Sequence, residues 1–264
     1  MSQDRSAARA GTRFCRRGFA LGGAILGLAM TATGCAATST ASNSVTLTVF
    51  AASSLTASFT QLGTQFEAAH PGTKVTFSFD GSSTLVDQLV AGAPADVLAT
   101  ADEATMTRAT KANAASNPQK FASNVLILIV PPGNPAKITG LDASLSGKKL
   151  VVCAPPVPCG ATTKKLATML GITLQPVSEE SKVTDVRAKV ETGQADAGLV
   201  FTTDATAAGT KVQTIPIPGA EKAPTTYVIA TTTAAKQPTL AKQFVEYVTG
   251  PDGQAALKTA GFGP

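Results

Sequence analysis

Small hydroxyl residues follow three predicted strands of this sequence and open a helix after the first two strands and, less clearly, after the third. The three groups are Ser53-Ser54, Ser82-Ser83-Thr84 and Thr202-Thr203. Serine and threonine are good N-caps, so helix capping explains each turn taken alone. Helix N-termini also expose backbone N–H groups and the positive end of the helix dipole, which bind anions without Arg or Lys. Several such turns together indicate a site of amides and hydroxyls for a dehydrated, unprotonated tetrahedral oxyanion.

Residues suited to catalysis are scarce. His70 is the only histidine, and its place before a proline in a turn is typical of a surface side chain. The sequence contains no Gly-x-Ser-x-Gly, phosphate-loop or dinucleotide-binding glycine motif. We therefore expect no catalytic residues and no enzyme activity. A cell-envelope hydrolase that uses Ser54 or Ser82 is the alternative from another class, and it lacks a partner base.

The elements that must position these turns alternate along the chain. Apolar runs and alternation predict strands at 45–50, 74–79, 95–100, 124–130, 149–153, 198–201 and 225–231. Helical spacing predicts helices at 55–66, 85–90, 161–170, 184–192, 240–248 and 251–260. This order of strand, turn and helix is typical of an α/β fold with parallel strands.

The composition limits the class of partner. The chain has 264 residues, 15% of them charged, and a formal net charge of +5. Five arginines and one aspartate precede Cys35, and without them 17 basic and 16 acidic residues remain. The positive charge therefore belongs to the leader. With no Trp and no run of Lys and Arg interleaved with aromatics, we expect no nucleic-acid binding.

Residues 1–34 have the pattern of an export signal. A basic region up to residue 17 precedes an apolar stretch at Gly18–Met30, which is too short to span the bilayer core of about 30 Å. Arg16-Arg17 fits a twin-arginine signal, and the general secretory route stays open. The protein is therefore expected to act outside the cytoplasm.

Cys35 ends this leader in the string Ala32-Thr33-Gly34-Cys35, which resembles a bacterial lipoprotein box with Ala in place of the usual Leu. In that case the Cys35 thiol carries a lipid that anchors the protein to the membrane, and residues 35–44 form a flexible tether. The alternative is ordinary cleavage nearby with an inert Cys35.

Two further cysteines, Cys153 and Cys159, flank a short Pro-rich segment. An exported chain meets an oxidising compartment, so this pair favours a disulfide. Two thiols without a second pair make at most half of a zinc site.

The chain also resembles a known family. The strings VFAASSLT at 49–56, SFDGSSTL at 78–85 and GAPAD at 92–96 look like those of the periplasmic molybdate-binding proteins of ABC importers. VPCG at 157–160, DVR at 185–187 and AGLVFTTDA at 197–205 follow in the family's order, and the resemblance extends over 45–264. GAPAD together with the upstream SSTL is the most specific part.

The resemblance implies a class II solute-binding fold with two α/β lobes and the ligand between them. One lobe would hold 45–124 and 229–264, and the other 125–228. Two crossover strands, at 124–130 and 225–231, would form the hinge.

The resemblance also assigns ligand contacts. Ser54 and Ser82 would bind molybdate through hydroxyl and backbone N–H, and Cys159 and Val186 through backbone N–H. A disulfide would then brace the loop that presents the Cys159 amide. The family's fifth contact is a tyrosine hydroxyl, and that position is Phe201 here.

Two departures concern the ligand. Thr203, or Thr202, is the nearest candidate to replace the hydroxyl missing at Phe201. Asp80 stands where the family commonly has a small neutral residue. Its carboxylate would repel an anion if it faces the site, or orient the Ser82 turn if it faces away.

The resemblance implies capture of molybdate, and of tungstate, for delivery to a membrane permease and its ATPase. It implies no cofactor and no direct metal ligand, and we expect a monomer. Receptors for sulfate, phosphate or iron are the alternatives among binding proteins. Iron favours tyrosines, and Tyr227 and Tyr247 lie outside the Ser-rich turns; phosphate favours an acceptor carboxylate, for which Asp80 is the candidate.

Overall fold

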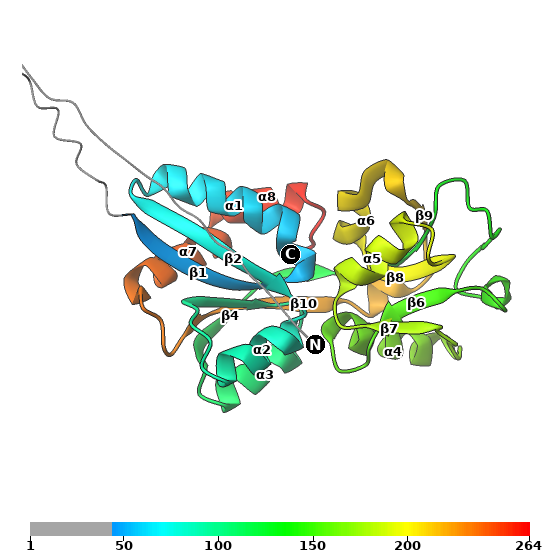
Figure 1. The fold of residues 1–264 in the computed structure, drawn as a ribbon, viewed down its shortest axis with the longest axis horizontal. Coiled ribbons are helices and arrows are strands. Elements are labelled where there is room, and N and C mark those ends of the chain that lie inside the picture. The colour runs from blue at the N-terminus through cyan, green and yellow to red at the C-terminus, as the bar shows by residue number, and fades with distance from the viewer. Residues whose placement is uncertain (1–43) are drawn as a thin grey trace, which may run out of the picture. The chain divides into compact units, whose positions relative to one another are not determined.

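The computed structural model describes residues 44–264. The predicted export signal, the lipidation of Cys35 and the tether up to residue 43 lie outside the described residues. None of the helices within 44–264 combines the length and the apolar character that a membrane crossing requires. These residues form two α/β lobes, each built on one five-stranded sheet (Figure 1).

The sheet of the first lobe has the strand order β2-β1-β3-β10-β4. Strand β1 is parallel to β2 and β3, whereas β10 is antiparallel to β3 and β4. Successive side chains of β1 face opposite sides of the sheet, so Leu47 and Val49 join the apolar cluster with α1 and Phe50 joins the one with α2 and α3. The strands are β1 (Val45–Ala52), β2 (Thr73–Asp80), β3 (Val97–Thr100), β4 (Ala115–Asn124) and β10 (Thr225–Thr232).

The sheet of the second lobe has the order β7-β6-β8-β5-β9. Its central strands β6, β8 and β5 are continuous apolar runs, because helices cover both of their faces. Strand β6 is parallel to β7 and β8, and β5 is antiparallel to β8 and β9. The strands are β5 (Leu126–Val130), β6 (Leu150–Cys153), β7 (Ser178–Glu180), β8 (Ala197–Phe201) and β9 (Gln213–Ile215).

The helices cover the sheets of their own lobes. In the first lobe α1, α7 and α8 pack together on one face and α2 and α3 on the other (Figure 1). The 3-10 helix η1 (Ser53–Leu55) leads directly into α1. The α-helices are α1 (Thr56–Ala69), α2 (Ser82–Val90), α3 (Glu103–Lys111), α4 (Pro158–Leu170), α5 (Val183–Glu191), α6 (Thr202–Ala208), α7 (Pro238–Thr249) and α8 (Pro251–Thr259).

The chain passes between the lobes twice within the described residues. The first passage is at Val125, between the end of β4 and the start of β5. The second lies between β9 and β10, ahead of Thr225. These passages differ in detail from the predicted crossover strands at 124–130 and 225–231, because β5 belongs wholly to the second sheet and β10 wholly to the first. The predicted limits of the lobes, 45–124 with 229–264 for one and 125–228 for the other, stay a prediction.

Candidate anion-binding site

A small cavity lies between the lobes. Its volume is about 10 Å³, room for about one water-sized group and far below the range of roughly 300–1,000 Å³ that is typical of pockets for organic ligands. This space suits at most a small ion. The first lobe lines it with Ala52, Ser53, Ser54, Gly81, Ser82 and Ala101, and the second with Val157, Pro158, Cys159, Ser181, Lys182, Val183 and Phe201.

Most of the lining consists of helix starts. The cavity meets the first residues of η1, α2, α4 and α5, and the residue before α6. In this set of helices no N-terminus has a side-chain cap. By contrast, α3 begins elsewhere, and the Asp102 carboxylate caps it by accepting from the Thr105 N–H at 2.8 Å. The first N–H groups of η1, α2, α4 and α5 are therefore available to an anion, whereas the first N–H of α6, from Thr202, donates to the Val125 carbonyl at 3.0 Å.

The hydroxyl turns do not act as side-chain caps, which was the alternative explanation from the sequence. The N-cap positions of η1, α2 and α6 belong to Ala52, Gly81 and Phe201, whose side chains offer no acceptor. Ser53, Ser54 and Ser82 instead lie in the first turns of their helices and line the cavity.

In both serines predicted to bind the ligand, the hydroxyl oxygen has a hydrogen-bond partner within the protein. The Ser82 Oγ accepts from the backbone N–H of Ala101 at 3.0 Å. An N–H group can only donate, so the Ser82 proton is left to donate elsewhere. The Ser54 Oγ lies 2.8 Å from the phenolic oxygen of Tyr227. Both serines are buried.

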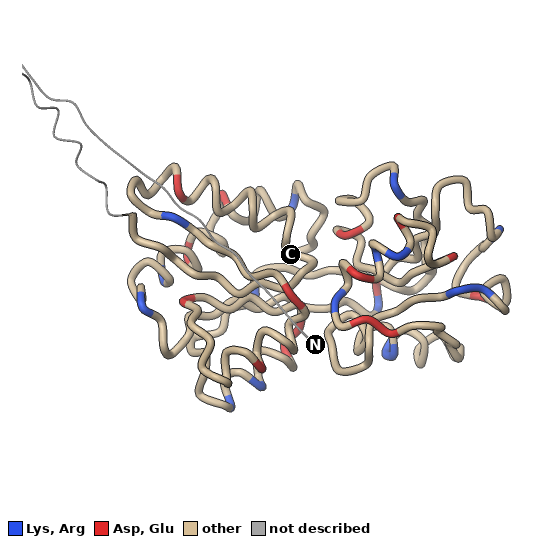
Figure 2. Tube along the Cα trace, in the orientation of Figure 1, with Lys and Arg blue, Asp and Glu red and all other residues tan. Residues whose placement is uncertain are grey.

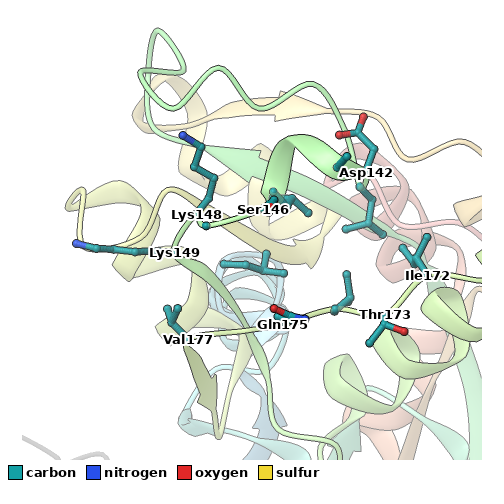
Figure 3. A pocket seen from close by; sticks show the side chains of 14 residues that line it. Asp142, Ser146, Lys148, Lys149, Ile172, Thr173, Gln175 and Val177 are labelled. Atoms are coloured by element: carbon teal, nitrogen blue, oxygen red, sulfur yellow. The ribbon is translucent and has the colours of Figure 1, made fainter.

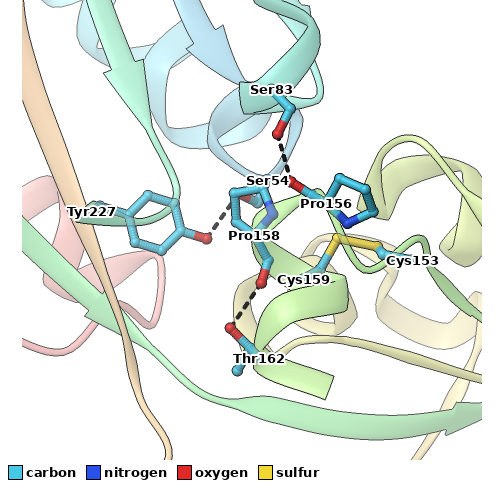
Figure 4. The surroundings of a disulfide bond; sticks show 8 residues. All are labelled: Ser54, Ser83, Cys153, Pro156, Pro158, Cys159, Thr162 and Tyr227. Atoms are coloured by element: carbon cyan, nitrogen blue, oxygen red, sulfur yellow. Dashed lines mark hydrogen bonds between the residues drawn. A yellow bond between two sulfur atoms is a disulfide. The ribbon is translucent and has the colours of Figure 1, made fainter. Parts of the chain in front are cut away.

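Cys159 lies in the first turn of α4 and forms a disulfide with Cys153 at the end of β6 (Figure 4). The turn between them is tight, because a Cβ at Gly160 would lie 1.9 Å from the Ala154 carbonyl oxygen. Opposite this turn, Ser83 of the first lobe donates to the Pro156 carbonyl at 2.8 Å. The disulfide loop thus reaches the cavity and contacts the other lobe.

Of the predicted site residues, Ser54, Ser82, Cys159 and Phe201 line the same cavity, and Val186 and Thr203 do not. The Val186 side chain is buried under Gly198 of β8. The Thr203 Oγ1 accepts from the side-chain amide of Asn124 at 2.8 Å. The residue of α5 that reaches the cavity is Val183 instead.

Asp80 is not part of the lining. Its Oδ1 accepts from the Gly81 N–H at 2.8 Å and lies 3.5 Å from the Lys182 Nζ of the other lobe. This carboxylate is therefore neutralised by a cation, and Lys182 itself lines the cavity. Elsewhere in the described part charged residues are scattered over both lobes without a large patch of one sign (Figure 2).

Sequence reasoning missed Tyr227 and Lys182. The sequence placed both tyrosines away from the Ser-rich turns, and for Tyr227 this is wrong in space, since its hydroxyl contacts Ser54. The two residues are 173 positions apart, and no local pattern reports such a contact. Lys182 is the N-cap residue of α5. Its place shortly before the predicted helix at 184–192 is the sequence feature that points to this residue.

A larger cavity lies in the second lobe, with a volume of about 550 Å³ (Figure 3). Its walls are residues 141–150 and 172–177, which are loops, the 3-10 turn at Ala143–Leu145 and the start of β6. Lys148 and Lys149 lie at its rim, and the Asp142 carboxylate bonds within its own loop to the Ser144 N–H at 2.8 Å. Because no α-helix begins there, this cavity lacks the converging donors of the first.

Residues 47–263 match the family described as bacterial extracellular solute-binding proteins, and the chain belongs to this family. Among its relatives, the molybdate-binding protein ModA of Mycobacterium tuberculosis is 47% identical over 218 residues, which cover 82% of this chain and 84% of the relative. ModA of Escherichia coli is 34% identical over 230 residues, covering 82% and 88%.

The fold, too, is similar to that of a solved molybdate-binding protein. The periplasmic molybdate-binding protein of Azotobacter vinelandii superposes with a TM-score of 0.72 at 24% identity, covering 82% of this chain and 98% of that one. The predicted two-lobed α/β solute-binding fold is confirmed.

Proposed function

We propose that this protein captures molybdate, and also tungstate, between its two lobes and delivers it to the permease and ATPase of an ABC importer. The observation that carries the proposal is the small inter-lobe cavity, around which uncapped helix N-termini from both lobes converge. The names of the relatives support the choice of ion. Membrane attachment through Cys35 belongs to the same proposal and lies outside the described residues.

The proposed ligand contacts are the hydroxyls of Ser54 and Ser82 and the first backbone N–H groups of the helices, among them that of Cys159. We keep the Val186 amide as a candidate from the resemblance, with Val183 beside the cavity as its alternative. A cavity lined by hydrogen-bond donors suits an ion whose four oxygens only accept hydrogen bonds. Binding replaces water by fixed dipoles, and no bond of the ion is made or broken, so we propose a binding protein and not an enzyme.

Lys182 adds one positive charge beside the cavity. Because Asp80 lies within 3.5 Å of it, the pair is close to neutral and the dipoles of the helices supply most of the attraction. Sulfate is the second candidate, since it too is an unprotonated tetrahedral dianion and would meet the same donors.

The test is thermal unfolding of the purified protein with molybdate, tungstate, sulfate, phosphate or no addition. Ligand at a thousandfold excess over its dissociation constant stabilises the native state by about 4 kcal/mol, so the binding ions raise the melting temperature. We expect stabilisation by molybdate and tungstate. Stabilisation by phosphate or sulfate alone would overturn the assignment.

A matched pair of variants connects this effect to the cavity. Ser54→Ala should lose most of the stabilisation by molybdate, because a hydrogen bond to a charged group contributes about 1.5–3 kcal/mol. Ser58→Ala is the control: this serine is one turn further along, is equally buried and bonds to the Leu55 carbonyl of its own segment. Equal losses in both variants would show that the ion binds elsewhere.

A further inference from the structure

We propose that Tyr227 is a positioning residue, which fixes the Ser54 hydroxyl as a donor toward the ligand and so makes the site select against protonated oxyanions. This inference rests on the proposed function. Tyr227 does not line the cavity, whereas Ser54 does. The phenol therefore acts on the ion through Ser54.

The phenol ring is held firmly behind the serine. Tyr227 lies in β10 and is fully buried. The rings of Phe121, Phe201 and Phe262 surround it at steep angles, with centroids 6.0, 6.0 and 5.3 Å away. Its hydroxyl points to Ser54, at 2.8 Å (Figure 4).

Either oxygen of this pair could donate, and the direction depends on which acceptors are within reach of the phenol; the Asn124 amide is not one of them. The Asn124 Oδ1 accepts from the Val125 N–H at 2.9 Å and from the Thr202 hydroxyl at 2.7 Å. Its NH₂ group therefore faces the other way, and it donates to the Thr203 Oγ1 at 2.8 Å. The orientation of the amide is fixed, because a backbone N–H has to meet the oxygen and not the nitrogen.

Burial raises the pKa of the Tyr227 phenol far above its usual range, so the phenol keeps its proton. The NH₂ group of Asn124 offers no acceptor for that proton. Within the described residues the Ser54 Oγ is the one hydrogen-bond partner of the Tyr227 hydroxyl, and a buried O–H without an acceptor is costly. The phenol proton therefore goes to the Ser54 Oγ. The proton of Ser54 is then left for the cavity.

Ser54 and Ser82, two of the four serines that line the cavity, therefore each direct their proton toward it. The Ala101 N–H occupies the oxygen of Ser82, as the Tyr227 hydroxyl occupies that of Ser54. A molybdate or sulfate dianion accepts from both. A monohydrogen phosphate that places its O–H at either of these two positions meets a proton and not a lone pair, and an unsatisfied buried donor is expensive.

Phe201 adds to the argument because it lies at the cavity and beside Tyr227. Its ring contributes no hydroxyl to the ligand. Tyr227 does not replace that hydroxyl as a direct contact; it strengthens the donor that is already there, since a hydroxyl that accepts one hydrogen bond donates a stronger one.

The experiment is a double-mutant cycle with Tyr227→Phe and Ser54→Ala, measured by calorimetric titration with molybdate and with phosphate. Tyr227→Phe keeps the ring and should weaken molybdate binding by about 3- to 10-fold, the range of one neutral hydrogen bond. In the Ser54→Ala background the same change should have less than about a 2-fold effect, because its target is gone. The preference for molybdate over phosphate should fall in Tyr227→Phe, since Ser54 can then accept.

Tyr247→Phe is the matched control, because this hydroxyl bonds to Gln65 on the surface at 3.1 Å and should leave both affinities unchanged. An equal loss from Tyr227→Phe with and without Ser54 would mean that the tyrosine acts through packing, and the inference would be wrong. Should Tyr227→Phe not melt cooperatively, Ser54→Ala decides alone: the inference requires a larger loss for molybdate than for phosphate. A wild-type protein that binds no molybdate refutes the proposed function itself, whereas binding that is indifferent to Tyr227 refutes only this inference.

Discussion

At Gly81 the two lobes approach each other tightly beside the cavity. It is the N-cap residue of α2, with φ −59° and ψ 134°, a conformation that alanine adopts without strain. A Cβ at this position would lie 2.2 Å from the carbonyl oxygen of Ser181 in the other lobe. Gly81→Ala should therefore leave the first lobe intact and prevent the lobes from closing fully.

The size of the effect follows from this distance. Non-bonded heavy atoms attract best at about 3.5–4.0 Å, so from 2.2 Å the lobes have to separate by roughly 1.3–1.8 Å. A hydrogen bond of about 2.9 Å then stretches beyond about 4 Å and is lost. If two contacts from the second lobe are lost, at about 1.5–3 kcal/mol each, molybdate affinity falls by roughly two to four orders of magnitude.

Calorimetric titration with molybdate measures this loss, and thermal unfolding without ligand checks the fold. Ser83→Ala is the control, since it removes the inter-lobe bond to Pro156 without adding an atom, and we expect at most about a 5-fold loss. If Gly81→Ala binds molybdate within about 3-fold of the wild type and melts normally, closure at this point is not required for binding.

Three further predictions concern stability and the disulfide. Burial raises the pKa of Asp204 from 3.8 to about 7. The unfolded chain loses this proton near pH 4 and the folded one near pH 7, so stability falls as pH rises through this window, by up to about 4 kcal/mol. Asp204→Asn should flatten the dependence of the free energy of unfolding on pH, measured by urea unfolding. An unchanged pH dependence would contradict the raised pKa of Asp204. Replacing both Cys153 and Cys159 by Ser should lower the melting temperature and weaken molybdate binding; an unchanged affinity would make the disulfide purely structural. Phe59→Ala should cost about 3–5 kcal/mol in chemical denaturation, because three aromatic rings pack around it, and a loss below 1 kcal/mol would mean that this cluster is loosely packed.

The sequence predicts the strands and helices whose residues repeat clearly, such as β1 and α1, and it does not predict the irregular ones. Strand β4 was missed because Ala115–Asn124 has exposed polar residues, a proline and two register shifts against β10, as an edge strand can. Strands β7 and β9 have three residues each, which is too short for a period. Helix α3 was missed because it is mostly polar, with Met106 and Ala109 as its buried apolar residues.

The candidate site also has a part that the sequence predicts and a part that it does not. The position of Ser54, Ser82 and Cys159 at one cavity was predictable. Each lies in a local string at the start of a helix, and helix starts at the carboxyl ends of strands gather at one edge of a sheet. The side chains behind them were not predictable. The contacts of Tyr227 with Ser54 and of Asn124 with Thr203 join residues 173 and 79 positions apart, and only the packed fold brings them together.

The uncapped helix starts have a consequence for how this site tolerates substitution. A donor that belongs to the backbone survives almost any exchange of its side chain, so positions such as Cys159 are free to use theirs for another purpose, here a disulfide. Proline is the exception, because it removes the N–H itself. Pro158 already occupies the first position of α4, where it sets the helix start and offers no donor. The N–H of Cys159 is therefore the first that this helix presents. A second proline there would remove this proposed ligand contact, which no other side-chain exchange removes.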